Sequence, residues 1–138
     1  MDESLILVVD TNILFTFFWK NFLTPEILIK KKLKLITSER AINEIDKHAA
    51  LIIDKTGITK KEFKIIKDDL YLLCAVIPLK EYSLYIKRAT DISPDEKDID
   101  FLALSFMFKC TLWSNDRKLK EQDLVEVLNT KEIIELSG

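Results

Sequence analysis

An unbroken apolar segment that runs directly into an aspartate is the feature that most constrains the fold of this chain. Residues 4–9 read Ser-Leu-Ile-Leu-Val-Val, and Asp10 follows. A strand without polar alternation is typical of a parallel sheet that is covered on both faces. Parallel strands need crossover connections, which are usually helical. The segment therefore predicts an α/β fold and places Asp10 at the carboxyl end of a buried strand.

The rest of the chain alternates between strand and helix patterns, as such a fold requires. Further strands are expected over residues 33–37, 75–79, 111–114 and 125–128. Helices are expected over residues 12–20, 25–33, 38–55, 59–73, 80–90, 93–109 and 131–136. This order predicts a three-layer α/β/α sandwich with a mainly parallel sheet. A chain of 138 residues has the length of one domain, so we expect residues 1–138 to form a single domain.

Local signals set several of the predicted helix boundaries. Ser38 is expected to cap the helix that follows it, and Gly57 to break the chain before Thr59 starts the next helix. The segment Ser93-Pro94-Asp95-Glu96 resembles a capping box with proline in the first turn. It predicts a helix start at Ser93, and the apolar run behind it predicts a helix that lies deep in the protein.

Charge and composition limit the classes of function. The 21 basic and 23 acidic side chains give a net charge of −2, which argues against tight nucleic-acid binding without a metal ion or a local basic patch. The lysines at 30–32 and Lys34 are expected to form a solvated helix end. His48 is the single histidine, so no histidine cluster exists, and Cys74 and Cys110 are expected to be buried free thiols. Apolar runs too short for a membrane span and an acidic start predict a cytoplasmic location.

Four acids are expected to meet at one edge of the sheet. Asp10 and Asp116 follow strands, while Glu44 and Asp98 lie near the starts of helices that leave the same edge. Each acid alone is explained as well by a helix cap or a turn. Together, four carboxylates repel one another unless a cation lies between them. An all-carboxylate set suits Mg²⁺ or Mn²⁺, and such a site can polarise a phosphodiester.

Asp98 and Asp100 compete for the third position of this set. They lie two residues apart, which is about 200° around a helix, so the two are expected on opposite sides. Asp98 precedes Phe101 and Leu102 by three and four residues, on a face that should be buried. An unpaired carboxylate there is costly, and Asp98 is therefore the expected site acid.

Two other enzyme classes also place an aspartate at a strand end. Haloacid-dehalogenase-like phosphatases need a second acid two residues later, where this chain has Asn12. Signalling receivers need two adjacent acids early and a lysine at a late strand end. Here Thr11 follows Asp10, and residues 113–115 contain no lysine. Neither pattern is present.

The acidic motifs resemble those of PIN domains, the nuclease fold of the VapC-type toxins. Val8 to Leu14 is similar to the opening strand and turn of that family, and Ser38 to Glu44 to its second motif. The interval of 116 − 98 = 18 residues is similar to the spacing of the last two acids. Val125 to Glu132 resembles the closing strand and helix, whereas residues 50–92 are similar only in helical character.

The resemblance implies a metal-dependent endoribonuclease that hydrolyses single-stranded RNA and uses Mg²⁺ or Mn²⁺ as its cofactor. The catalytic and metal-binding residues it implies are Asp10, Glu44, Asp98 and Asp116. Asn12 and Ser114 match positions that support such a site, although a helix cap and a strand-end hydrogen bond explain them as well. The alternative is a non-catalytic PIN-like scaffold that binds RNA or protein, but retention of all four acids favours catalysis.

The resemblance also bears on partners. It implies a homodimer, and the aromatic residues of the 12–20 helix offer more apolar surface than one amphipathic helix needs, so this helix is expected near the interface. These residues are Phe15, Phe17, Phe18 and Trp19. Whether the protein is the toxin of a toxin–antitoxin pair, with a cognate antitoxin protein as partner, stays open. No membrane partner is expected.

Overall fold

A computed structural model describes residues 5–19 and 32–136 and shows a five-stranded sheet in which every neighbouring pair is parallel. The strand order is β3-β2-β1-β4-β5. The strands are β1 (Leu5–Val9), β2 (Leu33–Ser38), β3 (Cys74–Ile77), β4 (Thr111–Trp113) and β5 (Val127–Leu128). The predicted α/β fold with a parallel sheet is confirmed.

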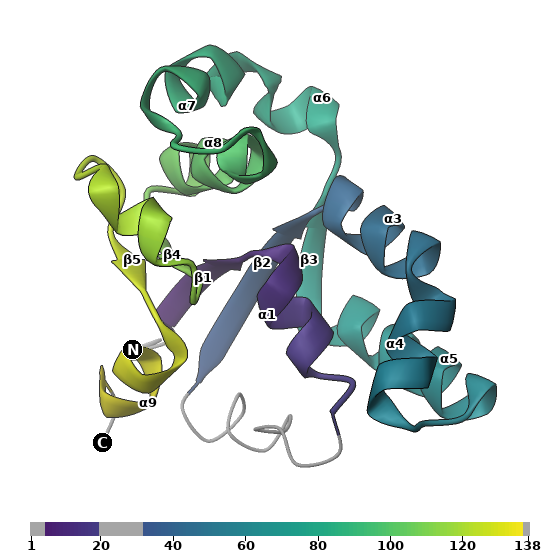
Figure 1. Ribbon diagram of the computed structural model, residues 1–138. Helices are drawn as coiled ribbons and strands as arrows, with labels where there is room; N and C mark the ends of the chain where they lie inside the picture. Colours follow the sequence, from purple (N-terminus) through teal and green to yellow (C-terminus); the bar gives the residue numbers. More distant parts are fainter. Residues whose placement is uncertain (1–4, 20–31, 137–138) are drawn as a thin grey trace.

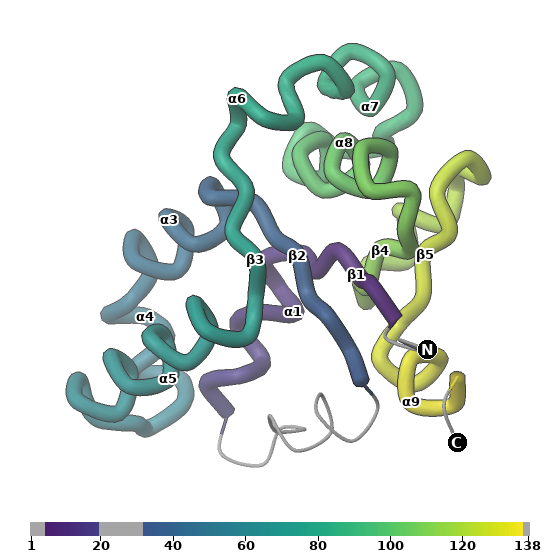
Figure 2. The backbone as a smooth tube through the Cα atoms, turned by 180° about the vertical axis from the view of Figure 1, so that it is seen from behind, coloured from purple at the N-terminus to yellow at the C-terminus, as the bar shows by residue number. Residues whose placement is uncertain are grey.

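Helices cover both faces of the sheet. They are α1 (Thr11–Thr16), α3 (Glu39–Lys47), α4 (Ala49–Thr56), α5 (Lys60–Leu73), α6 (Leu79–Tyr82), α7 (Ile86–Ile92), α8 (Ile99–Phe108) and α9 (Thr130–Leu136). Three short 3₁₀ turns accompany them: η1 (Ser83–Tyr85), η2 (Glu96–Asp98) and η3 (Arg117–Glu121). Figures 1 and 2 show α6, α7 and α8 on one side of the sheet and α1, α4, α5 and α9 on the other, which confirms the three-layer sandwich.

The sheet reverses its direction of growth at β1. The chain first adds β2 and β3 on one side of β1, and later adds β4 and β5 on the other side. Val9 pairs with Trp113, and the amide of Asp10 donates to the Trp113 carbonyl at 3.4 Å. The carboxyl ends of β1 and β4 therefore lie together at the point where parallel α/β sheets commonly bind ligands.

The core lies between β1 and α8. Leu7, Val8 and Val9 are fully buried, as the unbroken apolar strand predicts. Residues 101–106 of α8 are buried around the whole helix, and α8 contacts β1, β2 and β4. On the other face, the ring of Phe18 is fully buried and stacks on Phe63 with ring centroids 4.9 Å apart.

The predicted helix start at Ser93 is wrong, because α8 begins at Ile99. Ser93 does not cap a helix: its hydroxyl hydrogen-bonds the carbonyl and amide of Asp95. Asp95 instead caps the 3₁₀ turn η2, where its Oδ1 accepts from the Lys97 amide at 3.0 Å. The side chains of Ser93 and Asp95 thus hydrogen-bond the backbone of a local turn that precedes the helix, and Asp98 is the last residue of that turn.

The predicted helix over 38–55 is interrupted. Ser38 caps α3 as expected, with its Oγ accepting from the Ala41 amide at 3.0 Å. The backbone of His48 then leaves helical geometry, with φ −103° and ψ 17°, and α4 starts afterwards. Gly57 ends α4 in the left-handed region, with φ 75°, and Thr59 caps α5 as predicted.

Other boundaries differ by shorter segments. The 12–20 helix is observed as residues 11–16, and the 80–90 helix is divided by η1. The strand expected over 125–128 is reduced to Val127–Leu128, because Gln122 holds the backbone of Leu124 and Val125 in a loop. Most of the helix predicted over 25–33, with Lys30 and Lys31, lies outside the described residues, and its last residue belongs to β2.

Both cysteines are free thiols, as predicted. Cys74 is buried, whereas Cys110 is only partly buried, so that part of the prediction is wrong. Across the described residues, every helix is too short or too polar to cross a lipid bilayer.

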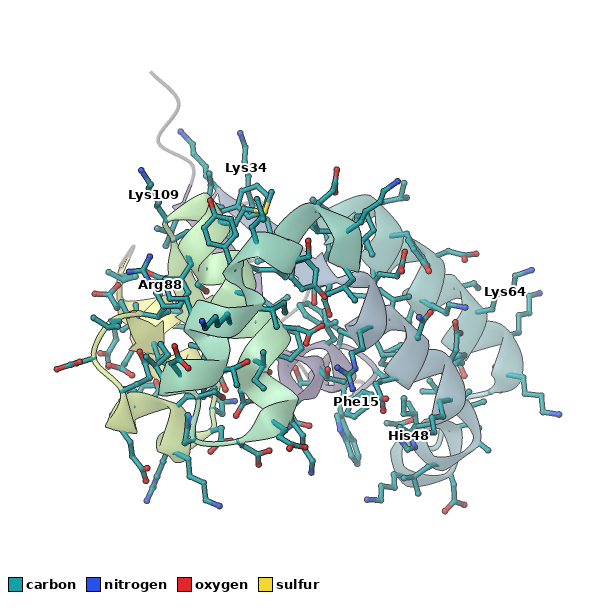
Figure 3. The ribbon with its side chains drawn as sticks, turned by 90° about the horizontal axis from the view of Figure 1, so that it is seen from above. Phe15, Lys34, His48, Lys64, Arg88 and Lys109 are labelled. Atoms are coloured by element: carbon teal, nitrogen blue, oxygen red, sulfur yellow. The ribbon has the colours of Figure 1, made fainter. Side chains whose placement is uncertain are left out.

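Replacement of Lys109 by Gly is expected to raise the free energy of unfolding by about 0.5–1 kcal/mol. Lys109 ends α8 in the left-handed region, at φ 51° and ψ 51°, which strains a residue with a Cβ atom. Its side chain points away from the molecule in Figure 3, so little packing is lost. Urea denaturation measures the change. Lys109→Ala keeps the strain and serves as the control; an equal gain in that variant would contradict the backbone explanation.

Candidate acidic site

One cavity brings the four predicted acids together at the carboxyl ends of β1 and β4. Its volume is about 430 Å³. Six carboxylates line it: Asp10, Glu44, Asp95, Asp98, Asp100 and Asp116. The other lining residues are Thr11, Asn12, Phe15, Ser38, Arg40, Ala41, His48, Lys97 and Phe101.

Asp10 has a structural role as well as a place in the cavity. Its Oδ1 accepts from the Ile13 amide at 2.9 Å and caps α1, and its Oδ2 accepts from the Ser114 hydroxyl. Burial raises the pKa of Asp10, with a smaller increase from the charge of Asp116, although both hydrogen bonds oppose this. The carboxylate is therefore fixed in orientation before any ligand binds.

Ser114 joins two of the acids. Its hydroxyl donates to Asp10 and accepts from the backbone amide of Asp116 at 3.1 Å. Asp116 in turn caps η3, because its Oδ1 accepts from the Lys118 amide at 3.0 Å. Ser114 is buried behind the lining residues, so its contact with the site runs through Asp10 and Asp116.

Asp98 is the acid whose charge is least compensated. Its side chain is 7% exposed, and its Oδ2 is buried without a hydrogen-bond partner among the described residues. Burial, together with the charges of Asp116 and Asp10, raises the pKa of Asp98 to about 6. Asp98 precedes α8 but its side chain makes no cap to that helix.

Glu44 lies at the more open side of the cavity. Its carboxylate is 40% exposed and stands 3.2 Å from Nε2 of His48, one helical turn later. The ring of Phe15 meets the His48 ring edge-on, with centroids 6.4 Å apart, and Figure 3 shows the two side chains next to each other. Glu44 thus reaches the cavity as expected from its place near the start of α3, but it is only half-buried there.

Asp100 does not point away from the site, contrary to the helical-angle argument. Asp98 ends the 3₁₀ turn and α8 starts only at Ile99, so the two acids are not on one continuous helix, and both line the cavity. Oδ2 of Asp100 accepts from the Tyr82 hydroxyl at 2.5 Å, and its Oδ1 is 3.5 Å from Nη1 of Arg40. This burial and pairing raise the pKa of Tyr82 strongly.

Asn12 lines the cavity as an exposed residue of α1. The alternative that it caps the helix is wrong, because Asp10 is the cap. Sequence reasoning missed Arg40 and Tyr82. One signal was available: Arg40 stands in the first turn of α3, where the helix dipole disfavours a cation, and such a placement is typical of a residue whose charge serves another contact.

The acids line a wall instead of forming a closed cage. Within residues 5–19 and 32–136, no three acidic, histidine or cysteine side chains converge closely enough to hold a metal ion as they stand. The described part of the cavity offers carboxylate oxygens, one imidazole and the cations Arg40 and Lys97.

A parallel sheet with carboxylates gathered at its reversal point defines an α/β protein with a strand-end acidic site. Within this class, the chain belongs to the PIN-domain family, whose model matches residues 8–134. The PIN fold is generally that of metal-dependent nucleases. A search of curated proteins gave no match to this sequence.

Proposed function

We propose that this protein is a metal-dependent endoribonuclease that hydrolyses phosphodiester bonds of single-stranded RNA. The observation that carries the proposal is the buried Oδ2 of Asp98, which lies beside Asp10 and Asp116 in the cavity wall and has no hydrogen-bond partner in the described part of the chain. A buried carboxylate that lacks compensation destabilises the fold. A cation bound between these acids supplies the compensation.

Mg²⁺ or Mn²⁺ is the proposed cofactor, and Asp10, Glu44, Asp98 and Asp116 are its proposed ligands. The donors are carboxylate oxygens, which these ions prefer. Because the ions keep several of their waters, the acids do not need to close into a cage. This agrees with the spread of the carboxylates along the cavity wall.

The side chains of the cavity have distinct proposed tasks. Ser114 holds Asp10 in orientation, and one carboxylate of the set accepts a proton from the attacking water. Lys97 and Arg40 offer positive charge to the phosphates of the RNA, which offsets the net charge of −2. When bound, the cation supplies electrostatic stabilisation for the charge that develops on the phosphodiester.

The finer assignments of partner and location stay predictions. These are the homodimer, the role as a toxin with a cognate antitoxin, and the cytoplasmic location. Of the aromatic residues proposed for the dimer interface, Phe18 is fully buried in the core, whereas Trp19 is 49% exposed. Trp19 is therefore the better candidate for a contact between two copies.

The test is cleavage of a pool of labelled single-stranded RNAs with Mg²⁺ or Mn²⁺. We expect cleavage that stops when EDTA is added, together with a higher melting temperature in millimolar Mn²⁺, because an ion that binds the folded state stabilises it by mass action. Chelator-resistant cleavage would point to a contaminant or another mechanism. RNA binding without cleavage across a diverse pool would favour the scaffold alternative.

A further inference from the structure

A second cavity of about 760 Å³ adjoins the acidic one. It is formed by residues of α3, α6, η1, α7, η2 and the first turn of α8. Its lining consists of Glu39, Arg40, Asn43, Leu79, Tyr82, Ser83, Ile86, Thr90, Glu96, Ile99 and Asp100. Arg40 and Asp100 line both cavities, so these two side chains form the wall between them.

The two cavities differ in chemistry. Six acids line the first cavity, whereas the second combines the apolar side chains of Leu79, Ile86 and Ile99 with three acids, Glu39, Glu96 and Asp100. Asn43 adds an exposed side-chain amide, which can both donate and accept hydrogen bonds. The volume lies within the roughly 300–1,000 Å³ of small-molecule sites. The apolar side chains can pack against the face of a nucleobase, and the Asn43 amide can hydrogen-bond its edge.

Tyr82 and Asp100 position the guanidinium of Arg40 between the two cavities. The Tyr82 side chain is 1% exposed, and its hydroxyl fixes Oδ2 of Asp100 at 2.5 Å. Oδ1 of Asp100 then faces Nη1 of Arg40 at 3.5 Å, while the Arg40 side chain is 73% exposed. One nitrogen of the guanidinium thus faces Asp100, and most of its five N–H donors are open to solvent. Such a fork matches the oxygens of a phosphate.

We infer that the second cavity is a subsite for the base of a nucleotide that flanks the cleaved bond, with Arg40 binding the phosphate between the two cavities. The inference rests on the proposed function and adds the residues that select the RNA sequence. Asn43 reads the base edge. Asp100 and Tyr82 are positioning residues for Arg40.

A binding experiment tests the subsite without catalysis. The 5′-monophosphates of adenosine, cytidine, guanosine and uridine, and inorganic phosphate, are titrated into the full chain in EDTA and followed by NMR. At least one nucleotide is expected to bind about 10-fold more tightly than inorganic phosphate, since burial of the base against aliphatic side chains and one edge contact are worth roughly that factor. Arg40→Gln is expected to weaken nucleotide binding about 10-fold through loss of the charge-assisted contact.

Two further variants sharpen the test. Thr90→Trp places a large side chain at an exposed position of the lining, and it is expected to block nucleotide binding while the protein stays folded. Arg88→Gln is the matched control: Arg88 lies 4.1 Å over the Phe106 ring, outside both linings, and Figure 3 shows it far from Phe15 and His48. Equal losses in Arg40→Gln and Arg88→Gln, or equal binding of inorganic phosphate and all four nucleotides, would overturn the subsite.

RNA cleavage separates this inference from the function on which it rests. In a pool of RNAs, Asn43→Ala is expected to change which nucleotide flanks the cut, as read by sequencing of the products. If nucleotides bind with the expected pattern but RNA is not cleaved, the nuclease function is refuted and the nucleotide-binding site is retained. Cleavage whose sequence preference is the same in the parent, Asn43→Ala and Thr90→Trp refutes the subsite alone.

Discussion

Asp98→Asn is expected to lower the rate of RNA cleavage by about 10²-fold or more, the usual loss when a preorganised electrostatic contact is removed. The substitution keeps the size of the side chain and removes its charge. Because Oδ2 of Asp98 is buried and has no hydrogen-bond partner within residues 5–19 and 32–136, loss of the charge is expected to weaken metal binding more than the fold. Single-turnover cleavage of a labelled RNA in Mn²⁺ measures the effect.

Two other aspartates serve as comparisons. Asp123→Asn changes an exposed acid outside both cavities and is expected to keep the parental rate. Asp100→Asn is expected to lose less activity than Asp98→Asn, since Asp100 is engaged with Tyr82 and Arg40. If Asp100→Asn abolishes cleavage and Asp98→Asn does not, the metal-binding role belongs to Asp100, and the family assignment is unaffected.

The metal-free protein is expected to lose stability as the pH rises from about 4 to about 7. The carboxyl of Asp98 titrates near 3.8 in an unfolded chain, and its pKa rises to about 6 in the fold. The folded state therefore binds this proton more tightly, and the free energy of unfolding falls as the pH passes through the folded pKa. The pKa of Asp10 is raised as well, so its titration acts in the same direction. We expect a loss of between about 1 and 3 kcal/mol.

Urea denaturation in EDTA at pH 4 and pH 7.5 measures this loss. Other groups titrate over the same range, so the difference between the parent and Asp98→Asn isolates the contribution of Asp98. At pH 7.5 the variant is expected to be the more stable protein without metal and the less active one with metal. Saturating Mn²⁺ should remove the loss in the parent, because ion binding requires the ionised carboxylates. A parent and variant with parallel pH profiles would contradict the buried-charge explanation.

Much of the fold follows from the sequence because an unbroken apolar segment such as Leu5–Val9 is typical of a strand in a parallel sheet that is covered on both faces. The strand ends then place Asp10 and Asp116 without any knowledge of distant contacts. The capping residues Ser38 and Thr59 were also predictable, since their partners lie three residues away.

The wrong predictions share a physical cause. A local sequence pattern can be compatible with two local structures, and it does not show which of them has the lower free energy. Ser93 hydrogen-bonds the backbone of Asp95 instead of a helix, and this shifts the start of α8 to Ile99. The shift brings Asp100 into the cavity beside Asp98. The contact of Arg40 with Asp100 joins residues 60 positions apart, so a single sequence carries little sign of it.

The different structural duties of the acids have an evolutionary consequence. Asp10 caps α1 and Asp116 caps η3, so each contributes to folding whether or not RNA is cut. Asp98 makes no such cap, and its charge destabilises the metal-free fold. In a lineage released from selection for cleavage, drift should therefore replace Asp98 early and retain Asp10 longest. The presence of Asp10 is then a poor indicator of nuclease activity, whereas the presence of Asp98 implies that selection still maintains the activity.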